Sequence, residues 1–249
     1  MDRQFTPYGP SHLLVLLTFA VGAALLVKAG RCHAGTAAAR RFSRGFAVVI
    51  AALYGTIQVA SMMPPSLHSS VPLHLTDLAS VVSAYALWTH RSWAFALTYH
   101  WGLVLSTQAL VSPALTGPDF PHYGFLAFWG LHLLVVWAAI YLTWGLGMRP
   151  NWRSYRITVA VTLAWAVVTF TFNSIAGTNY GFLNAKPATP SLLDVLAPWP
   201  WYLAPITLLV FGIWALMTWP WVQSGRREVE VDPAHHQQEE DAEQPPADQ

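Results

Sequence analysis

The chain alternates between long apolar stretches and short polar connections over most of its length. A helix of about 20 mostly apolar residues crosses the hydrocarbon core of a membrane, and stretches of about 18 or more are interpreted as spans. Short connections favour antiparallel neighbours in a compact bundle. The pattern therefore predicts an all-α, polytopic membrane bundle of seven transmembrane helices. The predicted spans are residues 11–29, 44–63, 72–90, 93–112, 123–147, 155–176 and 199–222.

Lysine and arginine are distributed unevenly between the two sets of connections. One set carries eleven of the 13 basic residues, whereas the other carries only Arg3 and Lys186. Connections rich in these residues stay on the cytoplasmic side of a membrane. We therefore predict a multi-pass protein of the plasma (cytoplasmic) membrane, with its N-terminus outside and its C-terminus in the cytoplasm. The eleven residues are Lys28, Arg31, Arg40, Arg41, Arg44, Arg91, Arg149, Arg153, Arg156, Arg226 and Arg227.

The amino-acid composition indicates which class of partner the protein contacts. Only 10% of the residues are charged and 54% are hydrophobic. Soluble domains carry about 25% charged residues, so the deficit indicates that much of the surface faces lipid. The composition gives no support to a soluble domain or to nucleic-acid binding. Membrane lipids are the predicted partners, and no cofactor, metal or particular oligomeric state is predicted.

The segments outside the spans predict three regions. Residues 1–10 are expected to be an extracytoplasmic N-terminus, followed by the transmembrane domain over residues 11–224. Eight of the 12 acidic residues fall in the last 22 positions, so residues 225–249 are predicted to be a disordered, acidic cytoplasmic tail. Residues 177–198 are rich in Gly, Pro and Asn yet not very polar. Because proline interrupts helices and non-helical backbone at membrane depth must be buried or line a cavity, we interpret this segment as an outer lid.

One acidic side chain, Asp77, lies inside an otherwise apolar span. A carboxylate in hydrocarbon costs roughly 2.5 kcal/mol or more, so it requires a partner or a polar cavity and indicates a functional site. His74 lies three positions earlier, on the same face of a helix. A carboxylate beside an imidazole sets its tautomer and stabilises its cation. The alternative is a polar clamp that holds neighbouring helices together.

Other polar residues are predicted to lie at a similar depth in the outer half of the membrane. A helix rises about 1.5 Å per residue, which places His132 deepest, near the midplane, and His100 apart from the others in the inner half. The predicted lid carries further polar residues above them. We expect these groups to surround one cavity and to bind its substrate. The predicted binding residues are Gln108, Asn173, Asn179, Tyr180, Asn184 and Lys186.

Three sequence motifs resemble those of the YwaF-type bacterial integral membrane family. They are PLHLTDL at residues 72–78, FPHYGFLAFWGLHLL at residues 120–134 and GTNYGFLNAKPATPSLLDVLAPWPWY at residues 177–202. The resemblance covers about residues 50–220. That family is similar to a eukaryotic multi-pass protein implicated in acyl exchange on ether phospholipids. It is more distantly similar to the androgen-induced family of intramembrane lipid hydrolases, which use a threonine nucleophile and a histidine.

The resemblance implies chemistry on lipid acyl groups, with one departure in this chain. The first group implies a cysteine nucleophile in a span, in a motif that reads PLHLCDL, whereas this chain has Thr76 at that position and its single cysteine, Cys32, in a basic connection. A threonine can act as a nucleophile when a base removes its proton, and His132 is the candidate base. Thr76, His132, His74 and Asp77 are therefore the predicted catalytic residues of a lipid acyl hydrolase or acyltransferase. Asn179 or Asn184 could stabilise an oxyanion.

Two other functions stay open at this point. His74, Asp77 and His132 could hold a zinc ion in an intramembrane hydrolase, with a fourth position open for water. Residues 199–222 contain no histidine, however, whereas zinc-dependent hydrolases of the alkaline ceramidase and adiponectin-receptor type draw histidines from their last span. Alternatively, an Asp and a His within spans are typical of proton-linked transporters or sensors.

Overall fold

The computed structural model describes residues 3–187 and 192–231, and the regular elements of these residues are helices. One isolated bridge joins Gln4 to Pro118. The helices are α1 (Pro10–His33), α2 (Ala37–Ser61), α3 (Leu75–Thr89), α4 (Ser92–His100), η1 (Trp101–Ser106), α5 (Gln108–Val111), α6 (Tyr123–Ile140), η2 (Tyr141–Gly145), α7 (Trp152–Ala176), η3 (Tyr180–Phe182), η4 (Leu192–Val195) and α8 (Leu203–Val231).

Five helices in the described part of the chain are long and apolar enough to cross a membrane. They are α1, α2, α6 together with η2, α7, and α8 through Ser224. The membrane character and the helical class are thus confirmed. The third and fourth predicted spans differ: α3 has only 15 residues, and the stretch from Ser92 to Val111 is divided by a π-helical segment, η1. α3 and each separate helix within Ser92–Val111 are shorter than the about 18 residues of a straight crossing.

Several helix ends differ from the predicted spans. α2 begins at Ala37, ahead of the predicted start, because the hydroxyl oxygen of Thr36 accepts a hydrogen bond from the Ala39 N–H at 3.2 Å. At the other end of the chain, α8 continues through Pro220 to Val231. The predicted disordered tail is therefore helical over residues 225–231. Its remainder, residues 232–249, lies outside the described residues.

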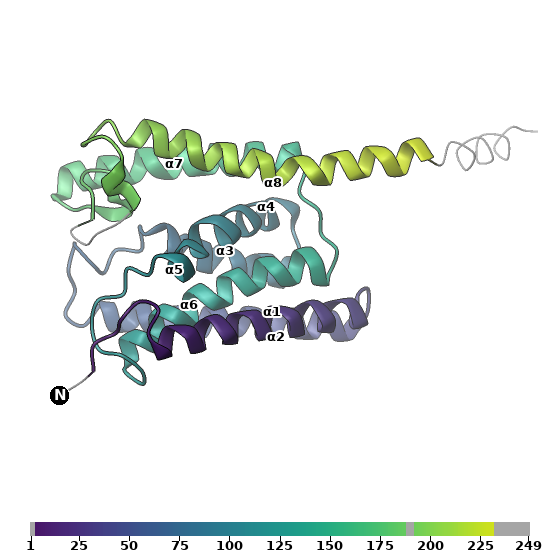
Figure 1. Ribbon diagram of the computed structural model, residues 1–249, viewed down its shortest axis with the longest axis horizontal. Helices are drawn as coiled ribbons and strands as arrows, with labels where there is room; N and C mark the ends of the chain where they lie inside the picture. Colours follow the sequence, from purple (N-terminus) through teal and green to yellow (C-terminus); the bar gives the residue numbers. More distant parts are fainter. Residues whose placement is uncertain (1–2, 188–191, 232–249) are drawn as a thin grey trace, which may run out of the picture.

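The long helices run side by side along the long axis of the molecule (Figure 1). α7 and α8 form one layer, α3 and α4 lie beneath them, and α6 leads down to α1 and α2. The α1–α2, α3–α4 and α6–α7 connections share the end of the molecule at which α8 projects. The first described residues and the α2–α3, α5–α6 and α7–α8 connections share the opposite end. We call the first end the basic end, because nine of the 13 basic residues lie in or within eight residues of its three connections and Arg226 and Arg227 lie in the projecting part of α8. We call the other the lid end, after the segment predicted as a lid.

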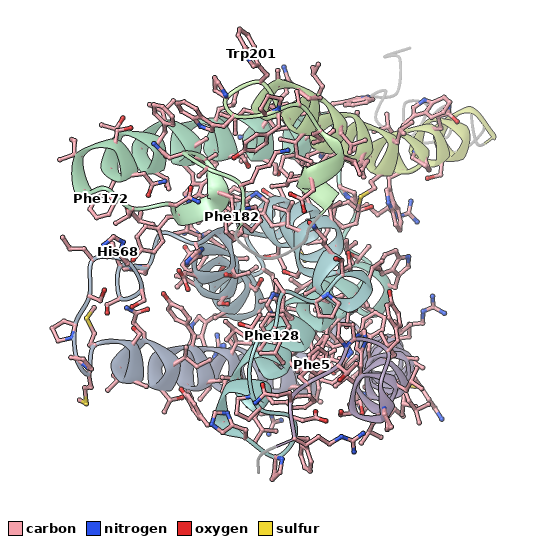
Figure 2. The ribbon with its side chains drawn as sticks, turned by 60° about the vertical axis from the view of Figure 1, so that its left-hand side comes forward. Phe5, His68, Phe128, Phe172, Phe182 and Trp201 are labelled. Carbon is pink, nitrogen blue, oxygen red and sulfur yellow. The ribbon has the colours of Figure 1, made fainter. Side chains whose placement is uncertain are left out.

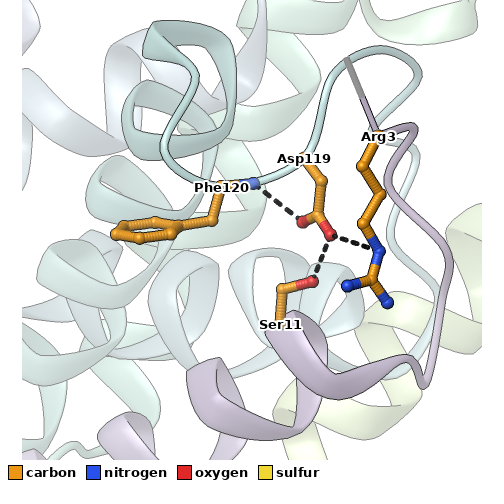
Figure 3. Close-up of polar contacts among 4 residues, drawn as sticks. All are labelled: Arg3, Ser11, Asp119 and Phe120. Carbon is orange, nitrogen blue, oxygen red and sulfur yellow. Dashed lines mark hydrogen bonds and ion pairs between the residues drawn. The ribbon is translucent and has the colours of Figure 1, made fainter. Parts of the chain in front are cut away.

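The N-terminal segment is fastened to the loop before α6 by a cluster of polar contacts (Figure 3). The Asp119 carboxylate accepts a hydrogen bond from the Ser11 hydroxyl at 2.6 Å and another from the Phe120 N–H at 2.8 Å. The Arg3 guanidinium lies 3.8 Å from the same carboxylate. Backbone bonds reinforce the contact, including one from the Asp119 N–H to the Arg3 carbonyl at 2.7 Å. This cluster, the N-terminal clasp, sets where α1 and α6 begin relative to each other.

Candidate functional site

A cavity of about 590 Å³ lies between α3, α6, α7, α8 and the α7–α8 connection. Most of its lining is apolar, including Phe128 of α6 and Phe182 of the connection, both labelled in Figure 2. The polar side chains that line it come from four different helices. They include His74 and Thr76 at the start of α3, His132 of α6, Thr162 of α7 and Thr207 of α8. The structure thus brings three of the four predicted catalytic residues to one cavity.

The hydroxyl of Thr76 differs from that of most threonines in the long helices. Thr76 is the second residue of α3, so the residue four positions earlier, Pro72, precedes the helix. Within residues 3–187 and 192–231, its Oγ1 has no hydrogen-bond partner, and it lines the cavity. Thr98, Thr143 and Thr169 are also without a partner among the described residues but do not line the cavity, and Thr207 lines it from α8 without a partner there. Most other helical threonines donate to a carbonyl about one turn earlier and are thereby occupied. These include Thr18, Thr56, Thr89, Thr107, Thr158, Thr162, Thr171 and Thr218.

The hydrogen bond of His132 sets which ring nitrogen is available as a base. Its Nδ1 lies 2.7 Å from the Phe128 carbonyl oxygen, which can only accept, so Nδ1 carries a proton and donates. In the neutral imidazole the lone pair is then on Nε2, and this atom has no partner among the residues that the structure describes. Such an arrangement fits a general base.

Thr76 and His132 also line a narrow cleft next to the main cavity, together with two serines. The Ser80 hydroxyl donates to the Thr76 carbonyl at 2.7 Å, whereas the Ser106 hydroxyl has no hydrogen-bond partner in the described part of the chain. Ser106 is the last residue of η1 and is only 2% exposed. Ser106 is not among the site residues predicted from the sequence, because the direction of its side chain depends on a π-helical turn, which is a rare departure from the regular α-helix.

Asp77 has a local role at the start of α3. Its Oδ2 accepts a hydrogen bond from the backbone N–H of His74 at 3.0 Å, so the carboxylate caps the helix. Asp77 does not line the cavity, and the partner it requires in apolar surroundings is this N–H group. The His74 imidazole instead packs edge-on against the ring of Tyr180, with the ring centroids 4.9 Å apart. His74 and Asp77 therefore interact through the backbone and not as an imidazole–carboxylate pair.

Two of the predicted binding residues hold the α7–α8 connection in place. The buried Asn173 donates to the Tyr180 carbonyl at 2.9 Å and accepts from the Tyr180 N–H at 2.9 Å and from the Thr178 hydroxyl at 2.7 Å. The Tyr180 hydroxyl donates to the Leu67 carbonyl at 2.8 Å, which joins the connection to the α2–α3 loop. Their side chains do not line the cavity. They position the segment from Gly181 to Leu183, which does.

The remaining predicted binding residues also lie outside the cavity lining. Asn179 donates to the Ala185 carbonyl at 2.9 Å, and the Asn184 amide donates to the Ser174 hydroxyl at 3.1 Å. The Lys186 ammonium donates to the Leu196 carbonyl at 2.9 Å. Gln108 is exposed in α5. A binding or oxyanion role for these four residues stays a prediction that this geometry does not support.

The residues that would be expected to bind zinc do not converge. In the described ranges, no group of three or more His, Cys, Asp or Glu side chains is placed to hold a metal ion. His74 and His132 both reach the cavity, but the Asp77 carboxylate is directed to the His74 backbone. The arrangement does not supply the ligand set of the zinc-dependent alternative.

The fold and the site together define the class of this protein. It is a multi-pass helical membrane protein with a largely apolar internal cavity, in which a hydroxyl and an imidazole nitrogen are free of other bonds.

Comparison with known families then identifies the family of this protein. The chain belongs to the TMEM164 family, whose family model matches residues 7–218 and thus most of its length. No significant match was found among curated proteins or among solved structures. The resemblance to YwaF-type proteins and to lipid acyltransferases stays a prediction.

Proposed function

We propose that this protein is an intramembrane enzyme that cleaves or transfers the acyl groups of membrane lipids. The observation that carries the proposal is the meeting of Thr76 and His132 at one apolar cavity, with the Thr76 hydroxyl and the His132 Nε2 both without another partner in the described residues. An apolar cavity within a membrane protein is suited to an acyl chain, since the chain keeps apolar surroundings when it leaves the bilayer.

The reaction would proceed in two steps, in which an acyl group is first transferred to Thr76 and then to an acceptor. The Thr76 hydroxyl oxygen attacks the ester carbonyl carbon, and its proton passes to Nε2 of His132. The ester C–O bond then breaks, and the departing lipid hydroxyl takes the proton from His132. The acyl group on Thr76 is afterwards transferred to water or to the hydroxyl of a second lipid, with His132 again accepting and returning the proton.

The start of α3 could stabilise the negative oxygen that forms during this attack. The first N–H groups of a helix have no acceptor within the helix. Those of Leu75 and Thr76 have no acceptor among the described residues, and both residues line the cavity. Oriented backbone N–H groups at a helix N-terminus stabilise developing negative charge. They are better placed for this role than Asn179 or Asn184, whose amides are bonded within the connection and to α7.

The proposal includes the full predicted topology. In it, α3 and the α4–η1–α5 stretch complete seven crossings, the lid end faces outward and the basic end faces the cytoplasm. The grouping of connections at the two ends in Figure 1 supports seven crossings. The eleven basic residues support the orientation, in the plasma membrane. The α7–α8 connection would then be an outer lid, because Gly181, Phe182, Leu183 and Leu193 form part of the cavity wall.

Covalent labelling with a fluorophosphonate probe tests the chemistry. The wild-type protein in membranes should be labelled, and the labelled peptide should contain Thr76. Thr76→Val should abolish the labelling, and Thr76→Ser should retain it. His132→Ala should slow it by about 10²–10⁴-fold, which is the usual contribution of a positioned general base.

Thr171→Ala is the matched control, because its hydroxyl is bonded to the Val167 carbonyl on the exposed side of α7. It should label at the wild-type rate. Labelling that persists in both Thr76→Val and His132→Ala would overturn the proposal. Labelling on Ser106 would assign the nucleophile to the other free hydroxyl of the cleft.

A further inference from the structure

The cavity extends deep into the molecule along one face of α8. The lining residues of α8 recur every three or four positions from Leu203 to Trp214, and these two residues are separated by about 16 Å along the helix axis. On α7, the lining residue farthest from the connection is Thr162. The cavity is therefore an elongated space with its inner limit at Trp214 and Thr162.

Hydrogen bonds from two tryptophans fix this inner limit, which we call the floor. Trp214 is fully buried, its indole N–H donates to the His100 carbonyl at 3.1 Å, and its ring stacks on Phe211 with centroids 5.5 Å apart. Across the cavity, the Thr162 hydroxyl accepts from the Trp101 indole N–H at 2.9 Å. The Trp214 indole is thus held by His100 of α4, and the Thr162 hydroxyl by Trp101 of η1. The floor therefore joins α8 and α7 to the middle layer of the molecule.

A buried polar cluster lies next to the floor. The His100 Nδ1 is 2.9 Å from the Thr158 hydroxyl, and its Nε2 is 3.0 Å from the Thr218 hydroxyl. All three residues have no exposed surface. An apolar chain that reached this cluster would have to separate buried hydrogen-bonded groups, which is costly. The cavity is consequently closed at Trp214 both by the indole and by the polar groups next to it.

We infer that the cavity takes an acyl chain lengthwise along α8 and that Trp214 sets the maximum chain length. This inference rests on the proposed function, because it places the acyl carbonyl at Thr76 and the end of the chain at the floor. Each added methylene strengthens binding by roughly fourfold as long as it is buried in the cavity. A chain that already reaches Trp214 gains nothing from a further methylene.

Competition binding tests the inference without requiring turnover. The full chain is purified in detergent with a fluorescent anthroyloxy fatty acid as the reporter, and saturated fatty acids from octanoate to eicosanoate displace it. For the wild-type protein, the affinity should rise with chain length and then level at a limiting length. Trp214→Ala should move this limit to longer chains. Trp219→Ala is the matched control, because Trp219 lies on the exposed face of the same helix, with 51% of its surface exposed, and it should leave the limit unchanged.

A second variant addresses the case in which Trp214→Ala fails to fold. Val210→Trp adds an indole one turn nearer to the connection, at another lining position, and should move the limit to shorter chains. A limit that stays at the wild-type length in the folded variants would overturn the inference while leaving the proposed chemistry intact. A wild-type protein that binds neither the reporter nor any of the fatty acids would overturn both.

Discussion

At the scale of single residues, candidate site residues differ from structural ones in whether their polar atoms already have hydrogen-bond partners. Thr76 and His132 have unpartnered atoms at the cavity wall. In contrast, Asn173, Asn179 and Lys186 bond to backbone groups of the α7–α8 connection, and Asn184 donates to the Ser174 hydroxyl of α7. The sequence predicted that polar groups would gather at this depth. It could not distinguish the two sets, because side-chain direction depends on packing and not on position in the chain.

Asp77 provides a prediction at this scale, since a helix cap and a catalytic acid respond differently to substitution. Asp77→Asn keeps an oxygen that accepts from the His74 N–H, and the protein should unfold close to the wild-type temperature. Asp77→Ala leaves that N–H without a partner and should cost about 1 kcal/mol of stability. Thermal unfolding followed by tryptophan fluorescence measures both effects. Probe labelling should continue in the Asn variant, and its loss in a stably folded protein would show that Asp77 takes part in the chemistry.

At the scale of helices, the apolar pattern predicted the long elements well and their interruptions poorly. α1, α6, α7 and α8 all lie within a few residues of predicted spans at one end or both. The late start of α3 results from the cap formed by Asp77, and the division at residues 101–106 results from π-helical turns. Such turns can mark functional sites. Hydropathy averages over these local features, so it reports that a helix is present but not where it is interrupted.

Close approach between α1 and η2 gives a second prediction. A Cβ atom on Gly30 would lie 2.4 Å from the Cα of Gly145, whereas a Cβ on Gly45 in α2 would meet no atom within 4 Å. Gly30→Ala must therefore push α1 away from η2 and should destabilise the protein by about 1–3 kcal/mol.

Gly45→Ala serves as the comparison, since it gains helix propensity without a clash and should stabilise by up to about 1 kcal/mol. Thermal unfolding of the two variants under identical detergent conditions gives the sign of each change. Equal effects from both substitutions would show that the α1–η2 contact does not require a small residue.

At the scale of the whole molecule, the charge distribution and the arrangement of connections agree. Nine of the 13 basic residues lie in or near the three connections at one end of the helix bundle, and Arg226 and Arg227 lie in α8, which projects at the same end (Figure 1). This agreement could be anticipated from the sequence, because the order of apolar stretches and basic residues along the chain determines both features. The separation of α7 and α8 into their own layer above the cavity could not, since it depends on which helix faces pack together.

Cysteine labelling in intact cells tests the proposed orientation. Cys32 is exposed at the basic end and should react with a membrane-impermeant maleimide only after the cells are permeabilised. A Ser69→Cys variant that also carries Cys32→Ser places the thiol in the α2–α3 loop, beside His68 in Figure 2, and should react in intact cells. The opposite pattern would invert the topology. Labelling of both thiols from the same side would contradict the single crossing, by α2, that separates Cys32 from residue 69.

The N-terminal clasp bears on the side from which a lipid would reach the proposed site. Arg3 is 73% exposed on its side chain, so its ion pair adds little, but the Ser11 hydroxyl and the backbone bonds bind the start of the chain to the loop before α6. The helix that carries His132 is thereby anchored at the lid end. In the proposed function, a lipid would be admitted on the other side of the cavity, at the α7–α8 connection, where the hydroxyls of Tyr180 and Tyr202 donate to the carbonyls of Leu67 and Phe182. A lipid would then enter by displacing the α7–α8 connection, while His132 keeps its position in the cavity wall.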